Sequence, residues 1–226
     1  MWRSDPVFQN RGDAGRRLAA ALAKYQGKGA VVLALPRGGV PVGFEVAKAL
    51  GADLDIILVR KIGAPGHAEL GIGAVVDGRN PALVLNEEII EELEPDPAYI
   101  ADEEERQLEE IERGRRLYRG DEPPLDVNGR IVILVDDGIA TGGTMKAALR
   151  GLISSKPSRR IVAAPVASSH ALDELARDAD EIVSLGELSF AIGAHYLDFA
   201  QTGDDEVIRL LEEAKSWRHA ASCHGG

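Results

Sequence analysis

The stretch IVILVDDGIATGGTMKAAL, residues 131–149, decides the fold. Five branched apolar residues at 131–135 predict a strand that is buried on both faces, as in a parallel sheet covered by helices. Two aspartates, Asp136 and Asp137, follow directly, and a loop of glycines and threonines then leads into a helical pattern. Ligands bind at the carboxyl ends of the strands in such sheets, so we expect the loop at 136–144 to hold the functional site.

The remainder of the chain alternates between strand and helix patterns. Apolar runs predict strands, and apolar residues spaced three and four apart predict helices. This alternation predicts an α/β fold with a mostly parallel, twisted sheet and helices on both faces. The expected strands are 30–35, 54–61, 71–76, 82–85, 131–135, 159–168 and 181–185, and the expected helices are 11–25, 41–50, 145–153, 171–179 and 204–217.

Residues 87–119 differ from their surroundings, being highly charged, acidic first and basic last. A thin apolar stripe at helical spacing predicts a helix pair broken at Pro95 and Pro97. Such a charge run is typical of a solvated face, so we interpret the segment as a helical insertion. We expect one domain over 1–218 and a disordered tail at 219–226, where His219, Cys223 and His224 are interpreted as part of a frayed terminus and not as metal ligands.

Composition excludes several functional classes. The 226 residues are 45% hydrophobic and 28% charged, with a net charge of −11, which disfavours a nucleic-acid groove because neutralising phosphates needs a basic stripe. One cysteine rules out a disulfide framework within the chain and fits a reducing cytoplasm. No export signal and no apolar run of about 20 residues is present, so we expect a cytoplasmic protein that is not membrane-bound.

The loop at 136–144 has the features of an anion site. It opens a helix, where backbone N–H groups lack partners and the helix dipole favours a phosphate, although neither GxxxxGK[ST] nor GxGxxG is present. Two aspartates beside a phosphate would be repelled by it. A sugar phosphate removes the conflict, because Asp136 and Asp137 would accept hydrogen bonds from ribose hydroxyls.

The segment VILVDDGIATGGT resembles the signature of the type I phosphoribosyltransferases, with Gly138 the least typical position. The resemblance implies that the ligand is phosphoribosyl pyrophosphate, carried with Mg²⁺, and that its ribose is displaced from pyrophosphate by a nitrogen acceptor such as a nucleobase. It places the ribose on the two aspartates, with Asp137 also counted as catalytic, and the 5-phosphate on Ala140, Thr141, Gly142, Gly143 and Thr144.

Two further loops complete the resemblance. PRGG (36–39), within ALPRGGVP, corresponds to the pyrophosphate loop, so the resemblance implies pyrophosphate contacts from Arg37, Gly38 and Gly39, and a cis peptide at Arg37–Gly38. RKIGAPGHAEL (60–70) corresponds to a mobile loop that closes over the reaction, with Arg60 and Lys61 as cations that stabilise the leaving group together with Arg37. His67 and Glu69 are candidates for proton handling.

The acceptor is the open question. Enzymes of this family for 6-oxopurines carry an aspartate just before the Thr-Gly, where this chain has Ala140. The segment 186–203 is a candidate hood over the acceptor, because Phe190, Tyr196 and Phe199 gather there in a chain with only 4% aromatics, although these rings would equally well close their own core. Across nearly its whole length the chain resembles a bacterial group of predicted phosphoribosyltransferases without a settled acceptor, and we expect a homo-oligomer, a dimer.

Two alternatives stay open from the sequence. Some members of this family bind phosphoribosyl pyrophosphate only as a regulatory signal, although no helix-turn-helix pattern is present here. A relative of phosphoribosyl pyrophosphate synthetases is the other alternative, but the chain is short for one and no ATP site is evident.

Overall fold

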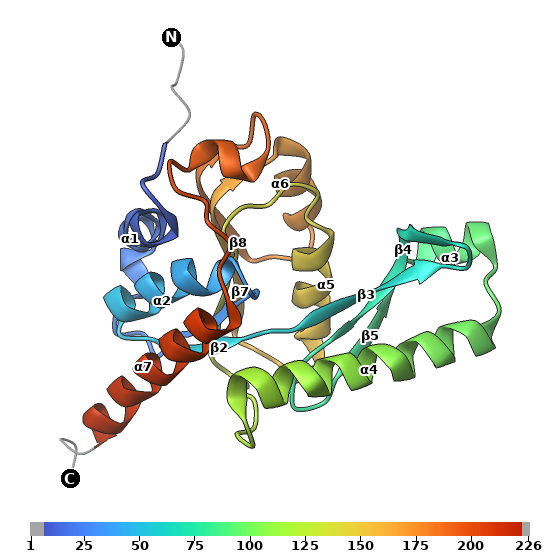
Figure 1. Cartoon of the computed structure of the whole chain (residues 1–226), viewed down its shortest axis with the longest axis horizontal. Helices are drawn as coiled ribbons and strands as arrows, with labels where there is room; N and C mark the ends of the chain where they lie inside the picture. Colours follow the sequence, from blue (N-terminus) through green and yellow to red (C-terminus); the bar gives the residue numbers. More distant parts are fainter. Residues whose placement is uncertain (1–6, 223–226) are drawn as a thin grey trace.

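The computed structural model describes residues 7–222, apart from the side chains at 68, 69 and 218–222. Strands and helices alternate through most of this range (Figure 1). The elements are α1 (Arg11–Ala21), η1 (Ala23–Tyr25), β1 (Val31–Ala34), α2 (Gly39–Leu50), β2 (Asp53–Ile56), β3 (Val59–Ala64), β4 (His67–Val76), β5 (Ala82–Leu85), α3 (Glu87–Leu93), α4 (Pro97–Arg119), β6 (Ile131–Val135), α5 (Gly143–Gly151), η2 (Ile153–Ser155), β7 (Arg159–Ala167), α6 (Ser169–Leu175), β8 (Glu181–Glu187), η3 (Ile192–His195) and α7 (Asp204–Ser222).

A five-stranded parallel sheet forms the centre, with the strand order β2-β1-β6-β7-β8. The predicted strand at 131–135 is β6, the middle strand of this sheet. Parallel neighbours end at the same edge, so the loops that follow β1 and β6 emerge side by side. The predicted parallel α/β fold is confirmed.

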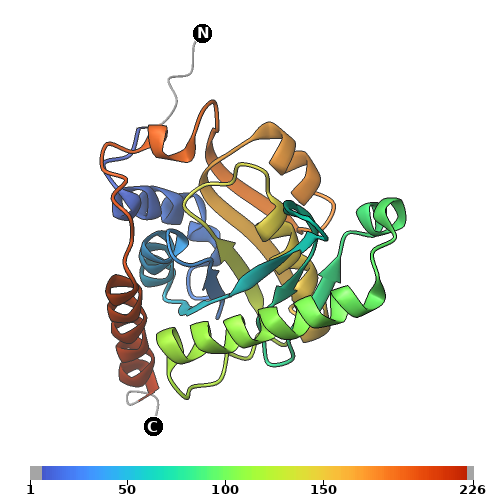
Figure 2. The ribbon, with the colours of Figure 1, turned by 45° about the vertical axis from the view of Figure 1, so that its right-hand side comes forward.

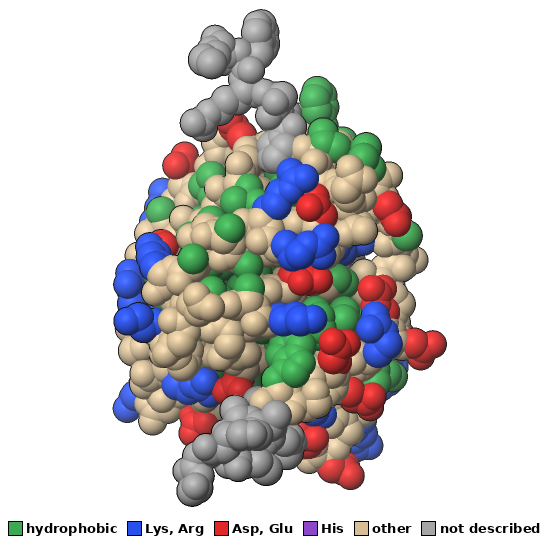
Figure 3. Space-filling model, turned by 90° about the vertical axis from the view of Figure 1, so that its left-hand side faces the viewer, with side chains coloured by type: hydrophobic (Ala, Val, Ile, Leu, Met, Phe, Trp, Pro, Cys, Tyr) green, Lys and Arg blue, Asp and Glu red, His purple; other side chains and the backbone are tan. Residues whose placement is uncertain are grey.

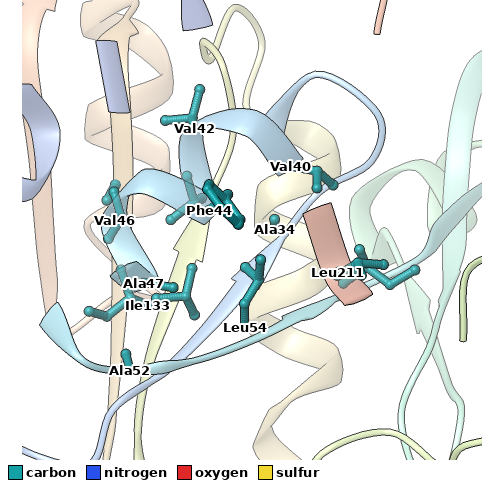
Figure 4. Packing of buried hydrophobic residues seen from close by; sticks show 14 of the residues in the cluster. Ala34, Val40, Val42, Phe44, Val46, Ala47, Ala52, Leu54, Ile133 and Leu211 are labelled. Carbon is teal, nitrogen blue, oxygen red and sulfur yellow. The ribbon is translucent and has the colours of Figure 1, made fainter. Parts of the chain in front are cut away.

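Alternation along the strands divides the core into two layers. Val32 and Ala34 of β1 face the cluster formed with α1, α2 and α7, while Val31 and Leu33 face the cluster formed with α5 and α6. Figure 4 shows the first layer, in which Phe44 of α2 packs among aliphatic side chains from the strands and from α7. Both faces of the sheet are therefore covered, which explains strands that are apolar at every position.

The expected single strand at 54–61 is wrong. It divides into β2, which pairs with β1, and β3, which joins β4 and β5 in a separate antiparallel sheet of three strands. Strand β1 ends at Ala34, and Pro36 beyond it has no N–H with which to extend a ladder. The chain therefore leaves the parallel sheet after Ile57, whose N–H makes the last bond, to the carbonyl of Ala34.

The expected mobile loop at 60–70 is instead the hairpin of β3 and β4, with its turn at residues 65–66. The expected helix pair at 87–119 is confirmed as α3 and α4, and Pro97 occupies the first turn of α4 behind the N-cap Asp96. Figures 1 and 2 show α4 running along the three-stranded sheet. Most of α4 is solvated, as expected, but Ile111, Gly114 and Arg119 are buried.

The predicted tail at 219–226 is partly wrong, because α7 continues to Ser222. Residues 215–222 contain neither glycine nor proline, so nothing in them stops the helix. Cys223 and His224 lie outside the described residues, as does the side chain of His219.

On the face over α1, α2 and α7, basic and acidic side chains are interspersed (Figure 3). None of the described helices has the combination of length and apolar character that crossing a bilayer demands.

Candidate functional site

The loops after β1 and β6 form one continuous surface. A Cβ on Gly38 would lie 2.1 Å from Oδ2 of Asp137, and a Cβ on Gly39 would lie 2.7 Å from the carbonyl oxygen of Val135. The N–H of Leu35 donates to that same carbonyl at 2.9 Å. Any side chain at 38 or 39 would separate the two loops, so the glycines are required by close approach and not by an unusual φ. The structure therefore brings the predicted pyrophosphate loop against both signature aspartates.

Asp136 is half-buried directly after β6, and its Oδ1 accepts a hydrogen bond of 2.9 Å from the N–H of Asp137. Burial, and then the charge of Asp137, raise the pKa of the Asp136 carboxyl well above its usual value, while the N–H of Asp137 and the charge of Arg11 act in the opposite direction. An acid with a raised pKa at the end of a strand is costly to keep ionised. Such groups gather at functional sites.

Asp137 has a partner that the sequence did not reveal. Nε of Arg11, in the first turn of α1, donates to Oδ2 of Asp137 at 2.7 Å, and both side chains are 12% exposed. The Arg11 guanidinium also donates to the carbonyl of Ala200 at 2.7 Å and lies 3.9 Å from the centroid of the Phe199 ring. Asp137 is thus neutralised from within the protein, whereas Asp136 accepts its hydrogen bond from a backbone N–H.

The cis peptide bond is one residue earlier than the resemblance implied. It joins Pro36 to Arg37, and the Arg37–Gly38 bond is not cis. Neither bond precedes a proline, so the sequence contains no signal that distinguishes them. The bond still lies within the predicted pyrophosphate loop.

Arg60 and Lys61 lie within β3 and not at a strand end, and their side chains line different cavities. Arg60 lines a cavity of about 310 Å³ together with Pro36 and Arg37 of the predicted pyrophosphate loop and Thr144 of α5. Lys61 lines a second cavity of about 200 Å³, beside Gly143. This divergence follows from the period of two along a strand. All three predicted loops therefore meet at the first cavity, with Arg37 and Arg60 as its cations.

The remaining predicted anion-site residues lie at the start of α5. Gly142, with φ of 76°, is the N-cap, and Gly143 is the first residue of the helix. Thr141 and Ala140 are exposed, and the carbonyl of Ala140 accepts a hydrogen bond from the Ser168 hydroxyl. The first N–H groups of any helix have no partner within it, which leaves donors for an anion here.

The structure does not bring the two candidates for proton handling, His67 and Glu69, into the description of the site. His67 is exposed in the tip of the hairpin, where it pairs with Ala64, and it lines neither of the two cavities. The side chain of Glu69 lies outside the described residues. Their roles stay predictions.

The predicted hood packs on the signature loop. The Tyr196 hydroxyl donates to the carbonyl of Asp137 at 2.6 Å, and its ring stacks on Phe199 with centroids 5.0 Å apart. A Cβ on Gly138 would lie 2.5 Å from Cγ2 of Ile192, which explains the glycine at the least typical position of the signature. Tyr196 therefore belongs to the protein's own core, whereas Phe199 and Phe190 are 37% and 77% exposed.

Sequence reasoning missed Arg11, Tyr118 and Asp204. Tyr118 and Asp204 line the same cavity as Arg37 and Arg60. In the sequence, Tyr118 belongs to the apolar stripe of a charged helix, and Asp204 is an ordinary acid at a helix start. A local pattern contains no signal for contacts between residues this far apart.

The donor atoms suit a Mg²⁺ ion that is held mainly by its ligand. Among the residues that the structure describes, no group of three or more His, Cys, Asp and Glu side chains is placed to hold a metal ion. Asp136 provides a hard carboxylate oxygen of the kind that Mg²⁺ accepts alongside phosphate oxygens and waters. Asp136 would thus be one protein ligand of such an ion.

Comparison with known proteins places the chain in a family. A family model described as "Phosphoribosyl transferase domain" matches residues 7–190. A Mycobacterium tuberculosis protein with a provisional name as a phosphoribosyl transferase is 43% identical over 210 residues, which are 92% of this chain and 47% of that protein. The chain therefore spans about half the length of the curated relatives it matches.

Two other matches bear on fold and ligand. The crystal structure of the protein TT1426 from Thermus thermophilus is 43% identical, with a TM-score of 0.79, over 92% of this chain and 98% of that one. A ribose-phosphate pyrophosphokinase from Methanopyrus kandleri is 35% identical over 136 residues, half of this chain and 45% of that protein.

Proposed function

The chain belongs to the phosphoribosyltransferase family, and on that premise we propose that it transfers the 5-phosphoribosyl group of phosphoribosyl pyrophosphate to a nitrogen acceptor, with release of pyrophosphate. One observation supports this most directly. A single cavity of about 310 Å³ is lined by residues of all three loops, with Arg37 and Arg60 as its cations and Thr144 from the start of α5. Two cations suit a pyrophosphate group, and a threonine at a helix start suits a second phosphate.

The roles of the individual groups follow from their positions. Arg37 and Arg60 would stabilise the negative charge that builds on pyrophosphate as it leaves, because fixed cations lower the energy of such a transition state. The first N–H groups of α5 and the Thr144 hydroxyl would bind the 5-phosphate. Asp136 would accept a hydrogen bond from a ribose hydroxyl. Mg²⁺, carried with the ligand, would neutralise part of the pyrophosphate charge.

The acceptor we propose is a nucleobase. The exposed ring of Phe190 offers a stacking surface on the hood, and the hood is held against the signature loop through Tyr196. Ala140 stands where family members for 6-oxopurines carry an aspartate, so we expect hypoxanthine and guanine to be poor acceptors. The pyrophosphokinase match supports a ribose phosphate as part of the ligand, since that protein's name describes one.

A calorimetric titration with phosphoribosyl pyrophosphate and Mg²⁺ tests the ligand, and pyrophosphate release across a panel of nucleobases tests the reaction. We expect binding that Asp136→Asn weakens and that Asp173→Asn, an exposed site on α6, leaves unchanged. A folded protein that fails to bind would refute the proposal. Binding without release for any acceptor would favour the regulatory alternative instead.

A further inference from the structure

The wall of the cavity opposite the predicted loops comes from two elements outside the signature motifs. Tyr118, in the last turn of α4, and Asp204, the first residue of α7, both line it. The Tyr118 hydroxyl donates to Oδ1 of Asp204 at 2.6 Å. A guanidinium nitrogen of Arg37 lies 3.7 Å from that same oxygen. The carboxylate of Asp204 therefore lines the same cavity as the guanidinium of Arg37.

The two contacts of Asp204 differ in strength. The Arg37 and Asp204 side chains are 39% and 43% exposed, and an ion pair of this length at that exposure contributes about 1 kcal/mol or less to stability. The bond from Tyr118 is short and charge-assisted, which makes it the stronger contact. Arg37 can therefore leave Asp204 at small cost, while the carboxylate stays bound to Tyr118.

The last turn of α4, which contains Tyr118, is anchored by the next residue, Arg119. Arg119 is buried, and its guanidinium donates to Asp55 and to Asp77, each at 2.7 Å. These bonds attach the last turn of α4 both to β2 and to the end of β4. The position of the Tyr118 hydroxyl is consequently fixed relative to the parallel sheet.

We propose that Asp204 is a displaceable counter-ion of Arg37: it holds the guanidinium at the cavity until the pyrophosphate group of the ligand takes its place. Tyr118 keeps the carboxylate on the cavity wall while this exchange occurs. The inference rests on the proposed function and deepens it, because it gives the charged insertion at 87–119 a role in ligand binding through α4.

The exchange would affect the affinity for every anion that binds Arg37. An anion that enters must displace Asp204 from Arg37, and the nearby carboxylate of Asp204 also repels it. Pyrophosphate carries more negative charge than orthophosphate and gains more from Arg37 and Arg60 together. The carboxylate of Asp204 also repels pyrophosphate more strongly than orthophosphate, so the counter-ion lowers the affinity for pyrophosphate by the larger factor.

The test measures pyrophosphate and orthophosphate binding by calorimetry in the absence of metal. Asp204→Asn keeps the size of the side chain and removes its charge, so pyrophosphate should bind roughly five- to tenfold more tightly, the scale of one partly screened charge. The affinity for orthophosphate, which carries less charge, should rise by a smaller factor. The matched control is Asp205→Asn, which removes the same charge from the next residue and should change the affinity less than about twofold.

Tyr118→Phe should act in the opposite direction. Without the hydroxyl, the Asp204 carboxylate loses its hydrogen-bond donor and interacts more strongly with Arg37. Pyrophosphate should therefore bind roughly two- to threefold more weakly. Tyr99→Phe is the control on the same helix, because it removes a hydroxyl that donates to the carbonyl of Gly63 at 2.9 Å, outside this cavity. In an Asp204→Asn background the effect of Tyr118→Phe should vanish.

The outcomes separate the two levels of the proposal. Wild-type protein that does not bind pyrophosphate would overturn the proposed function and this inference with it. Wild-type binding that Asp204→Asn leaves unchanged or weakens would overturn the inference alone. A purely structural role for Asp204 would lower the melting temperature of Asp204→Asn without tightening the binding of pyrophosphate, and that result also rejects the counter-ion.

Discussion

Nε of Arg11 lies 2.7 Å from Oδ2 of Asp137, so the first helix of the chain neutralises the second signature aspartate across 126 residues of sequence. The same guanidinium covers the ring of Phe199 in the hood. One side chain therefore connects α1, the hood and the strand end. Under the proposed function, Asp136 is therefore the carboxylate that would accept a hydrogen bond from a ribose hydroxyl.

Arg11→Gln should destabilise the protein by about 3 kcal/mol, because it leaves the carboxylate of Asp137 largely buried without its cation. Chemical denaturation measures this change in the free energy of unfolding. Arg16→Gln is the control on the same helix: its side chain is 59% exposed beside Glu45, and its loss should cost less than about 1 kcal/mol. Equal losses of unfolding free energy in the two variants would show that the Arg11–Asp137 ion pair stabilises the protein no more than an exposed pair.

Gly38→Ala should abolish tight pyrophosphate binding, since the new Cβ would meet Oδ2 of Asp137 at 2.1 Å and separate the two loops. We expect at least a tenfold loss of affinity in calorimetry, equivalent to about 1.4 kcal/mol. At Gly71 no atom lies within 4 Å of an added Cβ, so Gly71→Ala controls for the substitution itself. Unchanged binding by folded Gly38→Ala protein would show that the loops need not touch.

Asp136→Asn should stabilise the protein at neutral pH, because the raised pKa of Asp136 means that its ionised form is disfavoured in the folded state by burial and by Asp137. The amide oxygen can still accept the bond from the N–H of Asp137. The wild type has its full stability below the usual pKa of an aspartate and loses part of it as the pH rises through the raised pKa. The gain of the variant should therefore disappear in acid, as thermal unfolding across pH would measure. A gain that persists in acid would contradict this origin.

Asp204→Asn should lower the pKa of Tyr118. Burial first, and then the hydrogen bond to Asp204 and its charge, raise the pKa of this phenol to about 12, while Arg37 and Arg60 act in the opposite direction. Ultraviolet titration of phenolate should show one tyrosine shifting toward its usual pKa in the variant, and Tyr118→Phe identifies which one. Because the folded state favours the neutral phenol, this stabilisation is present below the usual tyrosine pKa and is lost as the pH rises toward 12.

Arg119→Met should destabilise the protein by about 3–5 kcal/mol, because it leaves Asp55 and Asp77 buried without their shared cation, although Arg115 still contacts Asp77. Arg116→Met, with a side chain that is 75% exposed on the same helix, should cost less than about 1 kcal/mol. Denaturant unfolding compares the two. A small loss for Arg119→Met would mean that the last turn of α4 is not anchored by this residue.

Local pattern was sufficient for the elements that decide the fold. The run at 131–135 predicted the central strand, and its uniform burial follows from helices on both faces of the sheet. Pro97 marked the start of α4 correctly, because a missing N–H is a property of a single residue. The family signature could likewise be found in the sequence, since a loop of this kind is contiguous in the chain.

Tertiary structure decided what depends on partners far apart in the chain. The residues at 54–61 are equally suited to one strand or two, and the end of β1 at Ala34 determined where they divide. Arg11 meets Asp137, and Tyr118 meets Asp204, only because elements distant in the sequence pack at one sheet edge. The sequence by itself thus determined the parallel sheet and the loop at 136–144 that opens α5, because both arise from short-range preferences. The counter-charges around that loop arise from packing, which no local pattern encodes.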